Sequence, residues 1–85
     1  MYEVRLRSHR VRRELEALPE AEQKRILSHL KDLATDPRPH GAVKLEGDIY
    51  RLRVGDYRVI YLVDEVHRRV EIGAIRRRQE STYHR

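Results

Sequence analysis

The fold of this chain is decided by residues 50–61, which read YRLRVGDYRVIY. Residues 49–54 predict a strand, because apolar residues and arginines alternate from Tyr50 to Val54, which is the pattern of a half-buried β-strand. The Gly55-Asp56 step that follows is typical of a two-residue hairpin turn of type II′, whose first central position favours glycine. Residues 57–63 are apolar at nearly every position, which indicates a central strand that is buried on both faces.

A two-residue turn also fixes the register of this hairpin. It pairs Val54 with Tyr57 and therefore Arg53 with Arg58. Because side chains alternate between the two faces of a strand, Arg51 shares the face of this arginine pair. The opposite face is a natural floor for helices, and it carries Tyr50, Leu52, Val54, Tyr57, Val59 and Tyr61.

Three clustered guanidinium groups need either carboxylate partners or an anionic ligand. Like charges directly opposite each other on a sheet destabilise it by roughly 0.2–1 kcal/mol per pair. One interpretation is a solvated face on which the arginines are neutralised by Glu46, Asp48, Glu71 or Glu80. The other is an anion site, favoured by Ile60 and Leu62, which continue the arginine face and lower the dielectric constant beside it.

The rest of the chain predicts a helical hairpin and further strands. The period of two in residues 2–7 indicates a strand, and apolar residues at helical spacing predict helices over 9–18 and 19–34. Residues 43–45 are a possible start of the sheet, and 69–75 form its last strand. The order β-α-α-β-β-β predicts a single α+β domain over residues 1–85, with an N-terminal helical hairpin packed on one face of a small antiparallel sheet.

Composition excludes several classes of site. The 85 residues include no cysteine, which excludes disulfides, thiolate zinc sites and cysteine nucleophiles. The five histidines show no metal-ligand spacing, so neither a metal nor a cofactor is expected. No stretch is long and apolar enough for a membrane span or a signal peptide, so we expect a cytoplasmic protein.

The charge balance points to an acidic or polyanionic partner. Lysine and arginine number 19 against 14 acidic residues, which gives a net charge of +5. Sixteen of the 19 are arginine, and no lysine follows Lys44. Arginine binds phosphate or carboxylate with a planar fork but stays protonated, so it stabilises charge without accepting protons.

Residues 44–47 read KLEG, and residues 76–83 read RRRQESTY at the end of the last predicted strand. Together with the hairpin sequence and the preceding helices, these stretches closely resemble the RelE/ParE superfamily of bacterial and archaeal toxins over nearly the whole chain. The resemblance implies a toxin that is neutralised by a cognate antitoxin. In the RelE-like branch, such a toxin enters the ribosomal A site and cleaves mRNA without a metal, by attack of a ribose 2′-hydroxyl on the adjacent phosphate.

The resemblance also implies roles for individual residues. Arg58 aligns with the family's arginine on the central strand and would stabilise the pentavalent phosphorane. Arg77, with Arg78 as the alternative under a small change of register, aligns with the arginine that follows the last strand. Tyr83 matches the C-terminal tyrosine and is the candidate for the base or for stacking on a nucleobase. Ile75 replaces a glycine that the family usually carries before that arginine.

Phosphate binding is implied for a second group of residues, Arg51, Arg53, Lys44 and Arg78. Arg51 and Arg53 fall where well-studied RelE-like members carry lysines. Arginine at these positions can bind phosphate as lysine does, but it cannot act as a general base. The RelE-like interpretation therefore predicts a ribosome-dependent mRNA endoribonuclease with ribosome, mRNA and antitoxin as partners. The alternatives are a ParE-like inhibitor of DNA gyrase and a basic RNA-binding module without catalysis.

Overall fold

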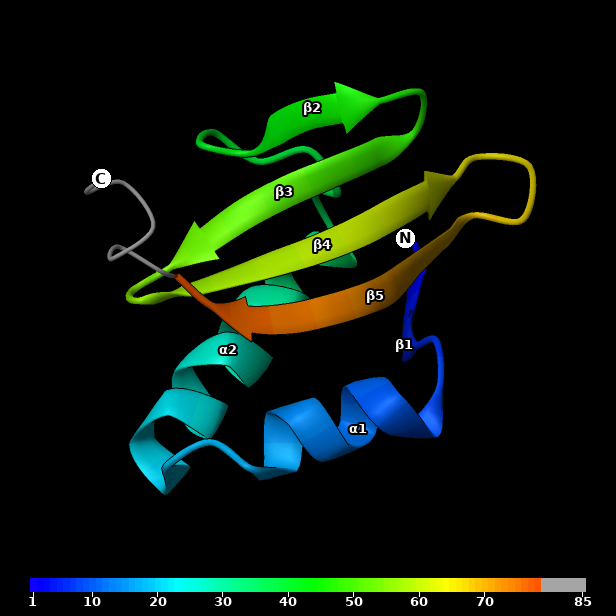
Figure 1. Cartoon of the computed structure of the whole chain (residues 1–85). Coiled ribbons are helices and arrows are strands. Elements are labelled where there is room, and N and C mark those ends of the chain that lie inside the picture. Colours follow the sequence, from blue (N-terminus) through cyan, green and yellow to red (C-terminus); the bar gives the residue numbers. More distant parts are fainter. Residues whose placement is uncertain (79–85) are drawn as a thin grey trace.

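The computed structural model describes residues 1–78, which form two helices and one five-stranded sheet. The elements follow the chain in the order shown in Figure 1: β1 (Glu3–Leu6), α1 (His9–Glu16), α2 (Glu20–Leu33), β2 (Val43–Glu46), β3 (Ile49–Val54), β4 (Tyr57–Asp64) and β5 (Arg69–Arg77). The order of strands across the sheet is β1-β5-β4-β3-β2, so β4 is central, as its apolar sequence predicts. The predicted burial of β4 on both faces is wrong, because buried residues alternate along it with half-buried ones on the face that the helices leave uncovered.

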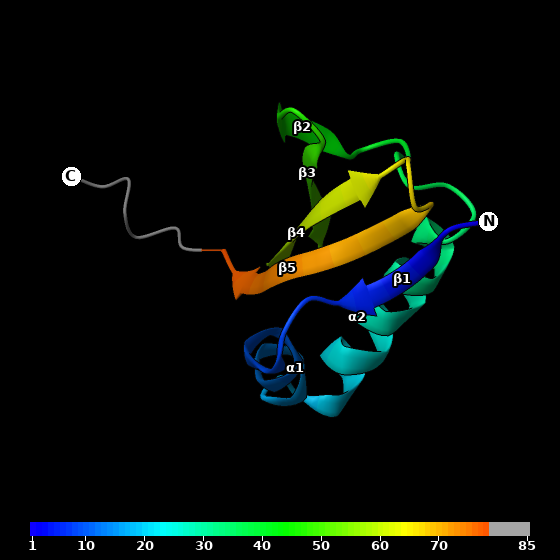
Figure 2. The ribbon, with the colours of Figure 1, turned by 90° about the vertical axis from the view of Figure 1, so that its right-hand side faces the viewer.

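Both helices cover the same face of the sheet (Figure 2), and the hydrophobic core lies between the two layers. The helices contribute Val11, Leu15, Ile26, Leu30 and Leu33. The sheet contributes the alternating inward residues of its central strands, Leu52, Val54, Tyr57, Val59, Tyr61, Val63, Val70, Ile72 and Ile75. The predicted α+β class and the helical hairpin on one face are confirmed.

The turn between β3 and β4 has the predicted geometry. Gly55 adopts a φ of +59°, while Asp56 keeps a negative φ, and a positive φ at the first central position alone is typical of type II′. The register follows from it, with Val54 opposite Tyr57 and Arg53 opposite Arg58. The two-residue turn therefore sets which side chains share a face of the hairpin.

Two features of the sheet differ from the prediction. The sheet is mixed, because β1 runs parallel to β5, with Val4 opposite Val70. The helical hairpin and three strands separate these two segments, so no tight turn forces them to be antiparallel. Residues 43–46 form a separate edge strand, β2, which pairs antiparallel with β3 through an irregular register near Leu45.

The helices begin and end close to the predicted bounds. α1 ends at Glu16 instead of 18, since the Leu18 N–H donates to the Leu15 carbonyl in a final tight turn at 3.2 Å. Pro19 occupies the N-cap of α2 instead of its first turn. Within residues 1–78, neither helix is both long and apolar enough to cross a membrane.

Candidate anion-binding site

The face of the sheet opposite the helices carries the arginines of the central hairpin. Arg51 and Arg53 point to this face from β3, and Arg58 points to it from β4 directly opposite Arg53. Side chains opposite each other in such a pair have Cβ atoms about 4.5–5.5 Å apart, so their guanidinium groups compete for the same space. The shared face expected from the register is confirmed.

These three arginines line a solvent-open hollow of about 140 Å³ together with Arg78. Arg78 reaches it because the chain continues along β4 beyond the end of β5, and the Arg78 N–H donates to the Asp56 carbonyl at 2.8 Å. Arg77 lies opposite Tyr57, whose side chain is buried on the helix side, so it does not line the hollow. Of the two alternatives for the arginine after the last strand, the structure brings Arg78 to the site.

The hollow has no internal counter-charge in the described part of the chain. No carboxylate among residues 1–78 lies within 4 Å of the four lining guanidinium groups, Arg51, Arg53, Arg58 and Arg78. The acidic residues on the same face of β1 and β5 are engaged elsewhere. The interpretation in which Glu46, Asp48 or Glu71 neutralise these arginines is wrong, and Glu80, which it also named, lies outside the described residues.

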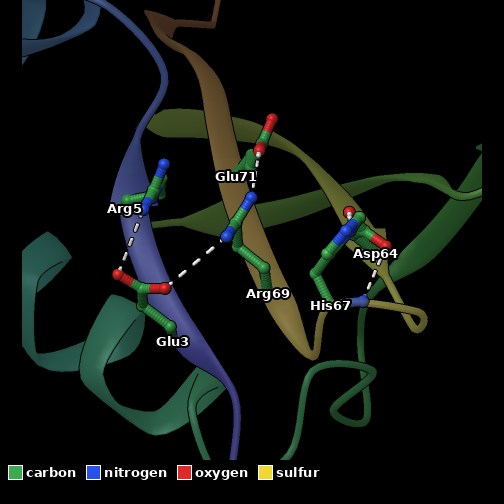
Figure 3. Close-up of polar contacts among 6 residues, drawn as sticks. All are labelled: Glu3, Arg5, Asp64, His67, Arg69 and Glu71. Atoms are coloured by element: carbon green, nitrogen blue, oxygen red, sulfur yellow. Dashed lines mark hydrogen bonds and ion pairs between the residues drawn. The ribbon is translucent and has the colours of Figure 1, made fainter.

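A separate ion-pair network explains where the acidic side chains of this face go (Figure 3). Glu3 on β1 approaches Arg5 at 3.3 Å and Arg69 at 3.6 Å, and Glu71 approaches Arg69 at 3.8 Å. At the nearby turn, His67 and Asp64 are 2.8 Å apart, and this contact lowers the pKa of Asp64. The open face is therefore neutralised at its β1 side and remains strongly cationic at the β3–β4 turn.

An apolar floor borders the arginine hollow. Ile60 lies opposite Arg51 and Ala74, and Leu62 lies one step further along β4. Both side chains are half-buried. Apolar neighbours lower the local dielectric constant, which strengthens the attraction between the guanidinium groups and an anion. The structure thus places Ile60 and Leu62 on the arginine face, as the sequence predicts.

The remaining site residues of the sequence analysis lie elsewhere. Lys44 lies opposite Tyr50, on the helix side of the sheet, and does not line the hollow. Tyr83 lies outside the described residues, so its part as a base stays a prediction. The lining up to Arg78 consists of arginine alone, which stays protonated and cannot serve as a general base. No group of three metal-ligating side chains occurs in the described residues.

A second cluster of polar side chains lies at the opposite end of β3 and β4. Arg38 contacts Glu65 at 2.7 Å and donates to the Tyr50 hydroxyl at 2.9 Å, while the Tyr2 hydroxyl donates to Glu65 at 2.7 Å. Beneath it, the Tyr61 hydroxyl donates to the Pro37 carbonyl at 2.8 Å, and burial raises the pKa of Tyr61 to about 12. Because these polar groups bind one another, we interpret the cluster as a clasp that holds the loop after α2 on the sheet.

Sequence reasoning missed Arg76, which lies directly opposite Arg58 on β5. The register between β4 and β5 shifts between Ile60 and Tyr61, so that Gly73 is an extra residue on β5. A glycine inside a strand is the usual sequence signal of such a bulge. Without the bulge position, the alternation of β5 could not be extended to the arginine run.

Comparisons with known proteins agree with this architecture. The family model described as ParE toxin of type II toxin-antitoxin system, parDE, matches residues 3–82. No curated protein sequence matches the chain. Among solved structures, RelE in the archaeal RelE-RelB complex from Pyrococcus horikoshii is 35% identical, with a TM-score of 0.86 over 93% of this chain and 97% of that one.

Two further structures share the fold at lower identity. The toxin-antitoxin complex RelBE2 from Mycobacterium tuberculosis matches with 27% identity and a TM-score of 0.78, over 91% of this chain and 98% of that one. The isolated Escherichia coli RelE toxin matches with a TM-score of 0.82 over 98% of this chain and 92% of that one, and at 17% identity it shows the fold alone. The family match over residues 3–82 and the archaeal relative place this chain in the RelE/ParE superfamily, as a toxin of a type II toxin-antitoxin system.

Proposed function

We propose that this toxin acts as a ribosome-dependent mRNA endoribonuclease. The observation that carries the proposal is the hollow of Arg51, Arg53, Arg58 and Arg78, which has no carboxylate within 4 Å among residues 1–78. Clustered guanidinium groups bind phosphate oxygens in bidentate fashion, and RNA offers a continuous row of such oxygens. An open hollow also suits a polymer better than a small, enclosed substrate.

In the proposed reaction, the ribose 2′-oxygen forms a bond to the adjacent phosphorus while the bond to the 5′-oxygen breaks. The 2′-hydroxyl gives its proton to a base, and the 5′-oxygen takes a proton from solvent water as it leaves, so the products are a 2′,3′-cyclic phosphate and a 5′-hydroxyl. Arg58 and Arg78 would stabilise the extra negative charge of the phosphorane, since cations held in place before the reaction favour the transition state. Tyr83 remains the proposed base.

We further infer that a cognate antitoxin neutralises this protein. RelE is found with RelB in the complex from Pyrococcus horikoshii, and the Mycobacterium tuberculosis structure is likewise a toxin-antitoxin complex. The net charge of +5 favours a partner that carries an acidic segment. Such a segment would compete with RNA for the arginine hollow.

Inhibition of DNA gyrase is the second candidate function. The matching family model is that of ParE toxins, and the hollow up to Arg78 is lined by arginine with no side chain that accepts a proton. The family match is the observation that supports this alternative, and the all-arginine lining is compatible with it because a binding protein needs no general base. A basic RNA-binding module without nuclease activity is the third candidate function.

One experiment separates these functions. The protein is added to a translation extract, and cuts in the mRNA are mapped by primer extension. Wild type is expected to cut ribosome-bound mRNA and Arg58→Ala is expected to fail. Arg12→Ala, which removes an exposed arginine on α1, should cut like wild type. Intact mRNA together with loss of gyrase supercoiling would assign the ParE-like function, and RNA binding with neither effect would assign the non-catalytic module.

A further inference from the structure

A row of arginines crosses three neighbouring strands at the edge of the hollow. Arg53 lies opposite Arg58, and Arg58 lies opposite Arg76. Arg76 is therefore as near to Arg58 along the sheet as Arg53 is. The hollow is nevertheless lined by Arg53, Arg58 and the more distant Arg78, and not by Arg76.

Glu14 accounts for the position of Arg76. This carboxylate comes from α1, which runs beside the C-terminal half of β5 (Figure 1), and its Oε2 lies 3.4 Å from Arg76 Nε. Its other oxygen, Oε1, accepts a hydrogen bond from the Ile75 N–H at 2.9 Å. Arg10 Nε approaches the same carboxylate at 3.6 Å.

The site occupied by Glu14 exists because β1 is short. The last bond between β1 and β5 runs from the Arg7 N–H to the Ile72 carbonyl, so β5 has an open edge beyond Ile72. A strand edge presents backbone N–H groups that need an acceptor. The Glu14 side chain, which is 20% exposed, supplies that acceptor and, with the same carboxylate, turns Arg76 toward the helix.

We propose that Glu14 is a positioning residue that withholds Arg76 from the arginine hollow. With the ion pair in place, the hollow offers four guanidinium groups to RNA phosphates. Loss of the Glu14 charge releases Arg76, which then adds a fifth guanidinium beside Arg58 and contacts one more phosphate. The identification of the anion as RNA rests on the proposed function, whereas the effect of Glu14 on Arg76 does not.

The test measures RNA binding without cleavage. A short single-stranded RNA with methylated 2′-hydroxyls cannot supply the attacking oxygen, and its affinity is measured by fluorescence anisotropy over a range of salt concentrations. Glu14→Gln keeps an oxygen that accepts from the Ile75 N–H but loses the charge. It should bind RNA about 3- to 5-fold more tightly at low salt, the scale of one partly exposed ion pair, with a log–log salt slope steeper by about 0.7.

Three further variants make the result specific. Glu16→Gln removes an equal charge from an exposed position on the same helix, and it should leave the slope unchanged. Arg76→Ala should keep the wild-type slope, because Arg76 is already withheld. The double variant Glu14→Gln/Arg76→Ala should lose the gain of Glu14→Gln. If Glu14 only accepted a hydrogen bond at the open edge of β5 and had no influence on Arg76, Glu14→Gln would change stability. The salt slope would then be the same in Glu14→Gln and in the double variant.

The proposal is overturned if folded Glu14→Gln has the wild-type slope, or if the gain persists in the double variant. Should Glu14→Gln fail to fold, Arg76→Ala by itself tests the proposal. A salt slope shallower than that of wild type would show that Arg76 already binds RNA, and it would overturn the proposal. Arg58→Ala distinguishes the two proposals. If Arg58→Ala binds RNA as tightly as wild type, the hollow is not the RNA site and both proposals are overturned. If mRNA stays intact in the extract, only the proposed nuclease activity is overturned.

Discussion

Arg53 lies directly opposite Arg58 across the β3–β4 pair, and no carboxylate among residues 1–78 lies within 4 Å of either guanidinium group. Such a pair works against folding, since like charges facing each other on a sheet are destabilising. Natural sequences keep locally unfavourable arrangements chiefly at functional sites. Stability and anion binding should therefore respond in opposite directions when this pair is broken.

Arg53→Gln should raise the free energy of unfolding by roughly 0.2–1 kcal/mol at low salt, because it removes one like-charge contact. Added salt should shrink the gain, since it screens the repulsion in wild type. Urea unfolding at low and high salt measures both effects. Arg12→Gln is the matched control, and it should show no such gain. A destabilised Arg53→Gln would mean that Arg53 has a stabilising partner.

Gly55→Ala tests the turn on which the register depends. Gly55 has a φ of +59°, and a Cβ added there would lie 2.6 Å from Arg25 Nη1. Strain in the backbone should lower the free energy of unfolding by about 1–3 kcal/mol. The double variant Gly55→Ala/Arg25→Ala removes the contact and keeps the strain, so it should remain destabilised in thermal unfolding. Full recovery in the double variant would assign the cost to the contact instead.

The clasp around Glu65 should make stability depend on pH. The hydrogen bond from Tyr2, followed by that from Arg38, lowers the pKa of Glu65 below its ordinary value of 4.5. A carboxyl whose pKa is lower in the folded state stabilises the protein above its unfolded pKa, and loses this effect as pH falls through the folded value. Melting temperatures of wild type and Glu65→Gln should thus differ above about pH 4.5 and converge in more acidic solution. Parallel curves over the whole range would contradict this assignment.

The sequence predicts the centre of this fold better than its edges. Gly55 and Asp56 determine the turn, and the register of the turn together with the alternation of residues 50–54 then places Arg51, Arg53 and Arg58 on one face. The partner of β1 is not encoded locally, because the parallel pairing with β5 depends on how the whole chain closes. Gly73 marks the bulge that shifts the register of β5, but the glycine alone does not say which residue is extra. The shift decides which arginines of the run at 76–78 reach the hollow.

The structure and the family alignment assign different arginines to the site after β5: the structure assigns Arg78, and the alignment assigns Arg77. Arg78 lines the hollow, whereas Arg77 lies opposite Tyr57 on the other side of the sheet. Arg78→Ala should reduce mRNA cleavage in a translation extract by about 10²–10³-fold, the usual cost of removing one group that stabilises the transition state. Arg77→Ala removes the same charge one residue earlier, and it should stay within a few-fold of wild type because it contacts no reacting phosphate. Both variants should melt like wild type, since both side chains leave the core untouched. The opposite ranking, with Arg77→Ala inactive and Arg78→Ala active, would mean that the chain after β5 takes another register when RNA is bound.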